Sequence, residues 1–154
     1  MQRCGLSGKI SRRKSRENAF IILFSSSFGT DLNEVIEVAR SQEDDHAADA
    51  FGEMLLQLYA QHTPEVDAAI EAHLKDWKLA RLPKVSLAIL RISAAEMLFG
   101  DADMDSVIIN EAVETAKRFG DEMDYQFING VLGSISRGKI AQGEALPVAD
   151  GDLV

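Results

Sequence analysis

Residues 83–99 read PKVSLAILRISAAEMLF, and their apolar side chains fall on every side of the predicted helix. A helix that is apolar all round is buried inside a globular protein. Pro83 suits the start of such a helix, where its missing N–H group leaves no hydrogen bond unmade. We therefore predict a central helix, with the rest of the chain packed around it.

On both sides of this segment, apolar residues recur at helical spacing between breaks at Gly29, Pro64 and Gly120. No stretch alternates as a strand does, so the predicted class is all-α with about seven helices. The further helices are expected over about residues 11–28, 32–39, 47–59, 63–77, 106–119 and 125–136, with Asp31, Thr63 and Asp121 or Asp124 as caps. The length suits one domain over residues 11–137, between a flexible basic arm at 1–10 and a disordered acidic tail at 138–154.

Charge is distributed unevenly along the 154 residues, whose net charge is −9. Residues 1–16 hold six of the 16 lysines and arginines and no acidic residue, whereas the remainder holds ten against 25 acidic residues. The chain is therefore expected to carry a basic arm on an acidic body, and this asymmetry is typical of interaction segments.

Residue patterns for catalysis or metal binding are absent from the sequence. Among the three histidines, His46, His62 and His73, no two lie one helical turn apart, which is the spacing that a pair of metal ligands on a helix needs. There is no P-loop, Rossmann glycine pattern or nucleophile elbow, and we predict no catalytic residue, metal or cofactor.

The single Cys4 cannot form an internal disulfide, which favours a reducing, cytoplasmic location. No apolar run is long enough to span a membrane. The Arg-rich, Ser-rich start is similar to a targeting peptide, but the apolar run at residues 19–24 is short for a signal sequence.

The segment SRRKSR at residues 11–16 places four cations at the start of the first predicted helix. Arg12 and Arg16 share one face of that helix, with Arg13 beside them. Cations there oppose the helix dipole, at a cost of about 0.3–1 kcal/mol each, so the arrangement indicates an anionic ligand. Guanidinium groups bind phosphate through two hydrogen bonds, which favours nucleic acid; a solubilising arm and an anionic membrane are the alternatives.

Four blocks of sequence carry a resemblance to a known family. They are RRKSRENAF at residues 12–20, LAILRISAAEML at 87–98, VIINEAVETAKRFG at 107–120 and YQFINGVL at 125–132. In this order and spacing they resemble the transcription antitermination factor NusB family over about residues 11–136, with residues 40–79 matching only in pattern. The resemblance implies two orthogonally packed helical subdomains, about 11–80 and 83–137, and no enzymatic activity.

The resemblance also implies partners. Members of the family bind the single-stranded boxA element of nascent ribosomal RNA, as a heterodimer with a small-subunit ribosomal protein called NusE in its transcription role. The complex joins elongating RNA polymerase and suppresses premature termination. The expected partners are therefore boxA RNA, NusE and, indirectly, the RNA polymerase elongation complex, with no membrane. Homodimerisation, which can mask the RNA surface in the family, stays open.

Matched position by position, Arg12, Arg13, Lys14 and Arg16 fall on the RNA-contacting segment of the family. The resemblance therefore implies that these four side chains bind phosphates and reach base edges.

Three aromatic residues and one acidic residue complete the implied site. Phe24 falls where many relatives have tyrosine, and Phe119 and Phe127 match aromatic positions on the RNA side of the family. A ring that stacks on a base contributes about 1–3 kcal/mol; core packing is the alternative for all three. Glu96 matches a position near the NusE interface, and its alternative is a salt bridge to Arg91 or to a neighbouring helix.

Two other functions stay open at this point. One is a helical interaction module without an RNA role, whose basic arm touches a membrane or an acidic protein. The other is a stand-alone relative of the N-terminal domain of an RNA cytosine methyltransferase, in which the same helical domain precedes the enzyme. We expect no methyltransferase domain in 154 residues, and no loop for S-adenosylmethionine is visible.

Overall fold

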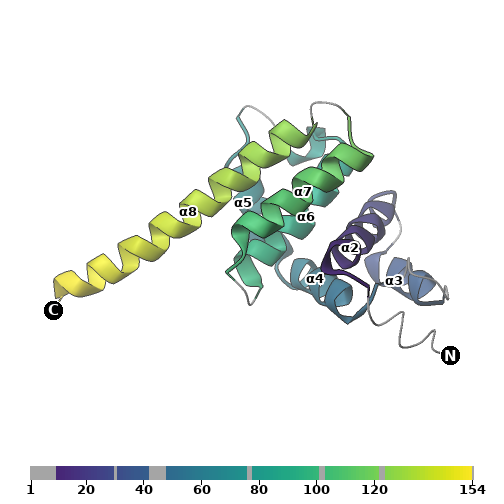
Figure 1. Ribbon diagram of the computed structural model, residues 1–154, viewed down its shortest axis with the longest axis horizontal. Helices are drawn as coiled ribbons and strands as arrows, with labels where there is room; N and C mark the ends of the chain where they lie inside the picture. The colour runs from purple at the N-terminus through teal and green to yellow at the C-terminus, as the bar shows by residue number, and fades with distance from the viewer. Residues whose placement is uncertain are drawn as a thin grey trace.

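The computed structural model describes six ranges of the chain: 10–29, 31–41, 48–75, 78–100, 103–121 and 124–153, without the side chains of 40–41 and 140–153. Within these ranges the chain forms seven α-helices and one short 3-10 helix, and no strand (Figure 1). The elements are α2 (Arg12–Ser26), α3 (Leu32–Ser41), α4 (Ala50–Gln61), α5 (Thr63–Glu71), η1 (Leu79–Arg81), α6 (Lys84–Phe99), α7 (Asp105–Phe119) and α8 (Asp124–Leu153). The predicted all-α class is confirmed.

Helix α6 is the centre of the fold, as its sequence predicts. Ten of its 16 residues are buried, and Leu90 is fully enclosed. The helix contacts α2, α4, α5, α7 and α8. The predicted subdomains meet at residues 80–83, and α6 packs against helices of both. They therefore share one core, and the boundary between them stays a prediction.

The ends of the helices follow from local chemistry. Ser11 caps α2, since its Oγ accepts a hydrogen bond from the Lys14 amide at 3.0 Å. After α2 the chain turns at Gly29 with φ +101°, a conformation that glycine adopts without strain. Asp49 caps α4 through the Gly52 amide at 2.8 Å, and its other carboxylate oxygen accepts from the Ser15 hydroxyl at 2.7 Å.

The start of α5 differs from the prediction. Thr63 is not a cap; it lies inside the helix, and its hydroxyl donates to the Tyr59 carbonyl at 2.7 Å because α4 runs almost directly into α5. His62 lies at the junction between α4 and α5, and its ring stacks on the ring of Phe99 with 3.8 Å between the centroids. The helix ends at Glu71, short of the predicted end at residue 77, which lies outside the described residues.

The end of the chain also differs from the prediction, because α8 continues past residue 138 to Leu153. Lys139 extends the packed part of this helix, since its Nζ donates to the Met97 carbonyl at 2.7 Å and to Asp105 at 2.8 Å. Beyond that point the helix projects away from the bundle (Figure 1). None of the helices in the described ranges is apolar for long enough to cross a membrane.

A polar network joins α4, α5 and α6. The Arg91 guanidinium donates two hydrogen bonds to Asp67, at 3.0 and 3.1 Å, and the Tyr59 hydroxyl donates to the same carboxylate. Burial, followed by the charge of Asp67, raises the pKa of Tyr59 to about 12, against the opposing effect of Arg91. Arg91 is therefore occupied by Asp67 and is not the partner of Glu96.

Replacing Leu90 with alanine tests the central position of α6. The truncation leaves a cavity in the closed core, so L90A is expected to lower the free energy of unfolding by about 2–5 kcal/mol in urea titrations. Val107, which is 42% exposed on α7, provides the control, and V107A is expected to change stability by less than about 0.5 kcal/mol. Equal effects of the two variants would contradict the central role of α6.

Candidate nucleic-acid interface

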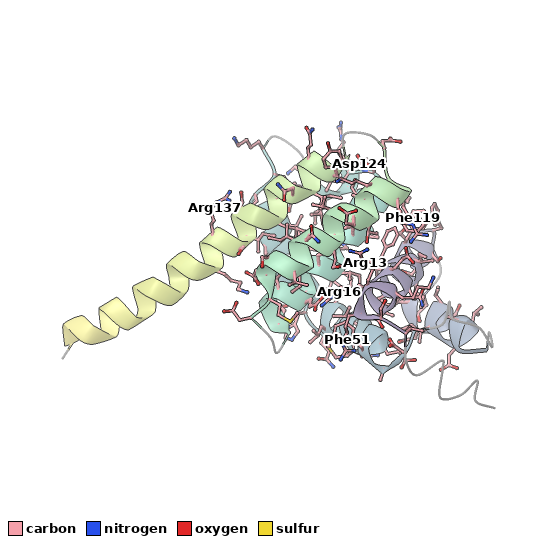
Figure 2. All side chains as sticks on the ribbon, viewed as in Figure 1. Arg13, Arg16, Phe51, Phe119, Asp124 and Arg137 are labelled. Atoms are coloured by element: carbon pink, nitrogen blue, oxygen red, sulfur yellow. The ribbon has the colours of Figure 1, made fainter. Side chains whose placement is uncertain are left out.

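The basic cluster opens α2, where the Ser11 cap sets the direction of the helix. Arg12 and Arg13 are exposed, Lys14 is half-buried, and Arg16 is buried. Figure 2 shows Arg13 and Arg16 on α2 next to α6 and α7. The four cations predicted to act together therefore lie in different surroundings.

Arg16 forms a buried ion pair with Glu96 of α6. The two guanidinium nitrogens lie 2.8 and 2.7 Å from the two carboxylate oxygens, and the residues are only 9% and 7% exposed. The hydrogen bonds to Glu96 raise the pKa of Arg16, although burial acts in the opposite direction. The predicted phosphate contact of Arg16 needs correction, because its guanidinium is already held inside the fold.

Glu96 needs the same correction. Its predicted role was contact with a partner protein, yet its carboxylate is buried and fully engaged by Arg16. The alternative given for it, a salt bridge to a neighbouring helix, is what the structure shows. The neighbour is α2, and Arg91 has a different partner.

Arg13 is held at the surface by α7. Its Nε lies 2.8 Å from Oε1 of Glu111, and this hydrogen bond raises the pKa of Arg13. Next to it, Glu17 accepts from Lys14 at 3.4 Å and from Arg118 of α7. Carboxylates of the chain thus hold Arg13 and Lys14. The Arg13 pair lies at the surface, where an anionic ligand can exchange with the carboxylate, whereas Glu17, the partner of Lys14, is buried.

Arg12 differs from the other cations because a ring holds it. Its guanidinium lies 4.0 Å from the centroid of Phe51 on α4, and Arg16 lies 5.3 Å from the same centroid. Within the described ranges, no carboxylate pairs with Arg12. The guanidinium is exposed, and the Phe51 ring holds it in place. Phe51 was not predicted as a support for the cluster, because a contact between α2 and α4 leaves no signal in a local sequence pattern.

Three side chains on one face of α2 meet side chains of α7. Arg13, Glu17 and Phe20 are separated by four and three residues, so they share that face. Glu111 lies beside Arg13, Arg118 beside Glu17, and Phe119 beside Phe20. A small cavity lies between the two helices, with α6 as its floor.

The predicted aromatic residues divide between core and surface. Phe119 is 39% exposed and lies 5.4 Å from the buried Phe20 ring, between centroids (Figure 2). Phe24 and Phe127 are half-buried and pack against the core. Part of each ring therefore contributes to core packing, which was the alternative to an RNA contact. Phe28 was not predicted as a site residue, yet its side chain is more exposed than those of Phe24, Phe119 and Phe127. Its position four residues after Phe24 was the sequence signal that could have indicated it.

No group of three His, Cys, Asp or Glu side chains in the described part of the chain is placed to hold a metal ion. The start of α2 instead presents cations, one of them over the half-buried ring of Phe51, and the exposed ring of Phe119 lies farther along the helix, against Phe20. Phosphate groups and bases are the ligands that this combination suits.

Comparisons with known proteins show the family of the chain. A model of the NusB family matches residues 13–137. The chain belongs to the NusB family. The transcription antitermination protein NusB of Macrococcus caseolyticus is 41% identical over 130 residues, which cover 84% of this chain and 99% of the relative.

Two solved structures share the fold of the NusB family. NusB of T. maritima has a TM-score of 0.73 and 30% identity, and the match covers 84% of this chain and 92% of that one. A chain in the structure of antitermination factors NusB and NusE in complex with dsRNA has a TM-score of 0.69 and 26% identity, with 82% and 96% covered.

Variants of the two ion pairs test the different roles of Arg16 and Arg13. R16M leaves Glu96 buried without a partner, so it is expected to lower the free energy of unfolding by on the order of 3 kcal/mol. R13M breaks a surface pair and is expected to change stability little. Urea titrations measure both effects.

The double variant R16M/E96M is the control for the buried pair. Because it removes both charges together, it is expected to recover part of the stability that R16M loses. Equal, small effects of R16M and R13M would contradict the assignment of Arg16 to the interior.

Proposed function

We propose that this protein binds the boxA element of nascent ribosomal RNA together with NusE. In this proposal the complex acts on elongating RNA polymerase in the cytoplasm and supports transcription of ribosomal RNA, without enzymatic activity of its own. The observation that carries the proposal is the exposed cationic start of α2, with the exposed ring of Phe119 packed on Phe20 farther along the same helix, in a chain that belongs to the NusB family. The relative solved with NusE and dsRNA supports the choice of partners.

Three cations at the start of α2 carry the proposed contact with RNA. Arg12, Arg13 and Lys14 reach the surface, whereas Arg16 positions α2 through Glu96. After residue 16 the chain holds ten basic against 25 acidic residues, so the rest of the molecule repels a polyanion. Binding by the chain alone is therefore weak, and a basic partner such as a ribosomal protein extends the positive track along which RNA lies.

Fluorescence anisotropy with a boxA RNA and a scrambled RNA, with and without NusE, tests the proposal. We expect selective binding that NusE strengthens, and a loss of several-fold in affinity for R12Q and for R13Q. Three phosphate contacts predict a log–log salt slope of about −2 for single-stranded RNA. Duplex boxA RNA is a parallel sample, because the solved relative is described with dsRNA.

Two outcomes of this titration would contradict the proposal. Equal affinity for both sequences, unchanged by NusE, favours the helical interaction module without an RNA role. Undiminished binding by R12Q and R13Q moves the RNA contact away from the start of α2.

Glu111 competes with RNA phosphate for Arg13, and E111Q tests this competition. The variant keeps a side chain of the same shape but removes the negative charge beside the guanidinium. We expect it to bind boxA RNA a few-fold more tightly in the same assay. E65Q, which removes an exposed carboxylate on α5, is the control for the change in net charge. Equal gains from both variants would show a general charge effect instead.

A further inference from the structure

A ladder of rings runs along α2 and ends on an exposed phenylalanine. The centroids of Phe20 and Phe24 are 6.2 Å apart, and those of Phe24 and Phe28 are 5.1 Å apart, with the last two rings edge to face. Exposure rises along the ladder, from 4% for Phe20 to 62% for Phe28. The contact with Phe24 fixes the orientation of the Phe28 ring while leaving most of it open to solvent.

A cation lies beside this ring. Lys84, the first residue of α6, places its Nζ 5.6 Å from the Phe28 centroid. Lys84 is exposed and, within the described ranges, no carboxylate pairs with it. A cation at the start of a helix opposes the helix dipole, and no side chain caps α6. The local charge therefore attracts an anion.

The chain around Lys84 strengthens this attraction. Lys75, Lys78, Arg81 and Lys84 are all exposed, and they are four of the ten basic residues that follow residue 16. The other basic side chains of the described body are held by carboxylates or by a serine hydroxyl. This segment is thus a second concentration of positive charge on an otherwise acidic body.

We propose that Phe28 and Lys84 form a second subsite for single-stranded RNA, in which a base stacks on the Phe28 ring and the adjoining phosphate pairs with Lys84. The subsite rests on the proposed function, because it continues the RNA path that begins at the start of α2. Arg13 and Phe24 lie eleven residues apart on one face, about 16 Å along the helix. RNA that occupies the start of α2 reaches Phe28 only if it extends beyond that contact.

The chemistry of the patch favours RNA over an apolar protein surface. The exposed part is a single ring beside a cation, since Phe24 is already half-buried against the core. A base and its phosphate offer a flat face and a negative charge together, and stacking on a ring does not depend on which base is present. The subsite therefore adds affinity rather than sequence selectivity.

Two RNAs separate this subsite from the start of α2. One is a short boxA RNA, and the other is the same RNA extended by several nucleotides at both ends; both are titrated with NusE present. We expect wild type to bind the extended RNA more tightly. F28A is expected to weaken binding of the extended RNA by about 5- to 100-fold, from the loss of one stacked base, and to leave binding of the short RNA unchanged.

Further variants distinguish stacking from charge. F28W keeps a stacking ring and is expected to retain affinity for the extended RNA. K84Q is expected to make the log–log salt slope shallower by about 0.7, the effect of one phosphate contact on a single strand. R137Q, with the same change in net charge on α8, and V107A, with an exposed apolar residue truncated on α7, are the matched controls and are expected to bind as wild type. Thermal unfolding checks that each variant is folded.

Each remaining outcome overturns the subsite in a recognisable way. If F28A binds the extended RNA as wild type while R13Q is weakened, the subsite is excluded and the proposed function stands. If wild type binds neither RNA, the proposed function and the subsite fail together. If F28A weakens binding of NusE in the absence of RNA, the ring docks a protein instead.

Discussion

The ion pair between Arg16 and Glu96 fixes how α2 lies on the central helix α6. Both groups are taken out of water, which is costly for charges unless their geometry is good, and two short hydrogen bonds supply that geometry. Arg12 and Arg13 lie about one turn before Arg16, at the exposed start of the helix, whereas Phe20 lies one turn after it and packs against the core. The buried contact thus anchors the helix whose first turn presents the exposed cations.

Arg13, Lys14 and Arg118 have carboxylate partners of their own, so a phosphate that binds them must compete with these carboxylates. Glu111 holds Arg13, and Glu17 holds Lys14 and Arg118. These pairs keep long, flexible side chains in place, so less conformational entropy is lost when a phosphate replaces a carboxylate. They also reduce affinity for anions of any kind. In the proposed complex, affinity therefore depends on what RNA and NusE add beyond simple charge.

Much of the architecture could be predicted from sequence, because it depends on local rules. The all-round apolar pattern of residues 83–99 predicts α6, and Ser11 and Gly29 mark the limits of α2. The separate surroundings of Arg12 and Arg16 could not be predicted, since both belong to one basic run and their partners come from α4 and α6. Thr63 shows a similar limit: an N-cap signal is overridden when the preceding helix continues almost without a gap.

The partners of the basic cluster are far away in the sequence, and this affects when the surface can form. Glu96 lies 80 residues after Arg16, Glu111 lies 98 residues after Arg13, and Arg118 lies 101 residues after Glu17. During synthesis from the N-terminus, the arginines leave the ribosome long before their carboxylates exist. The surface therefore assembles only when α7 has been translated, and until then the start of the chain is an unpaired polycation beside the ribosome.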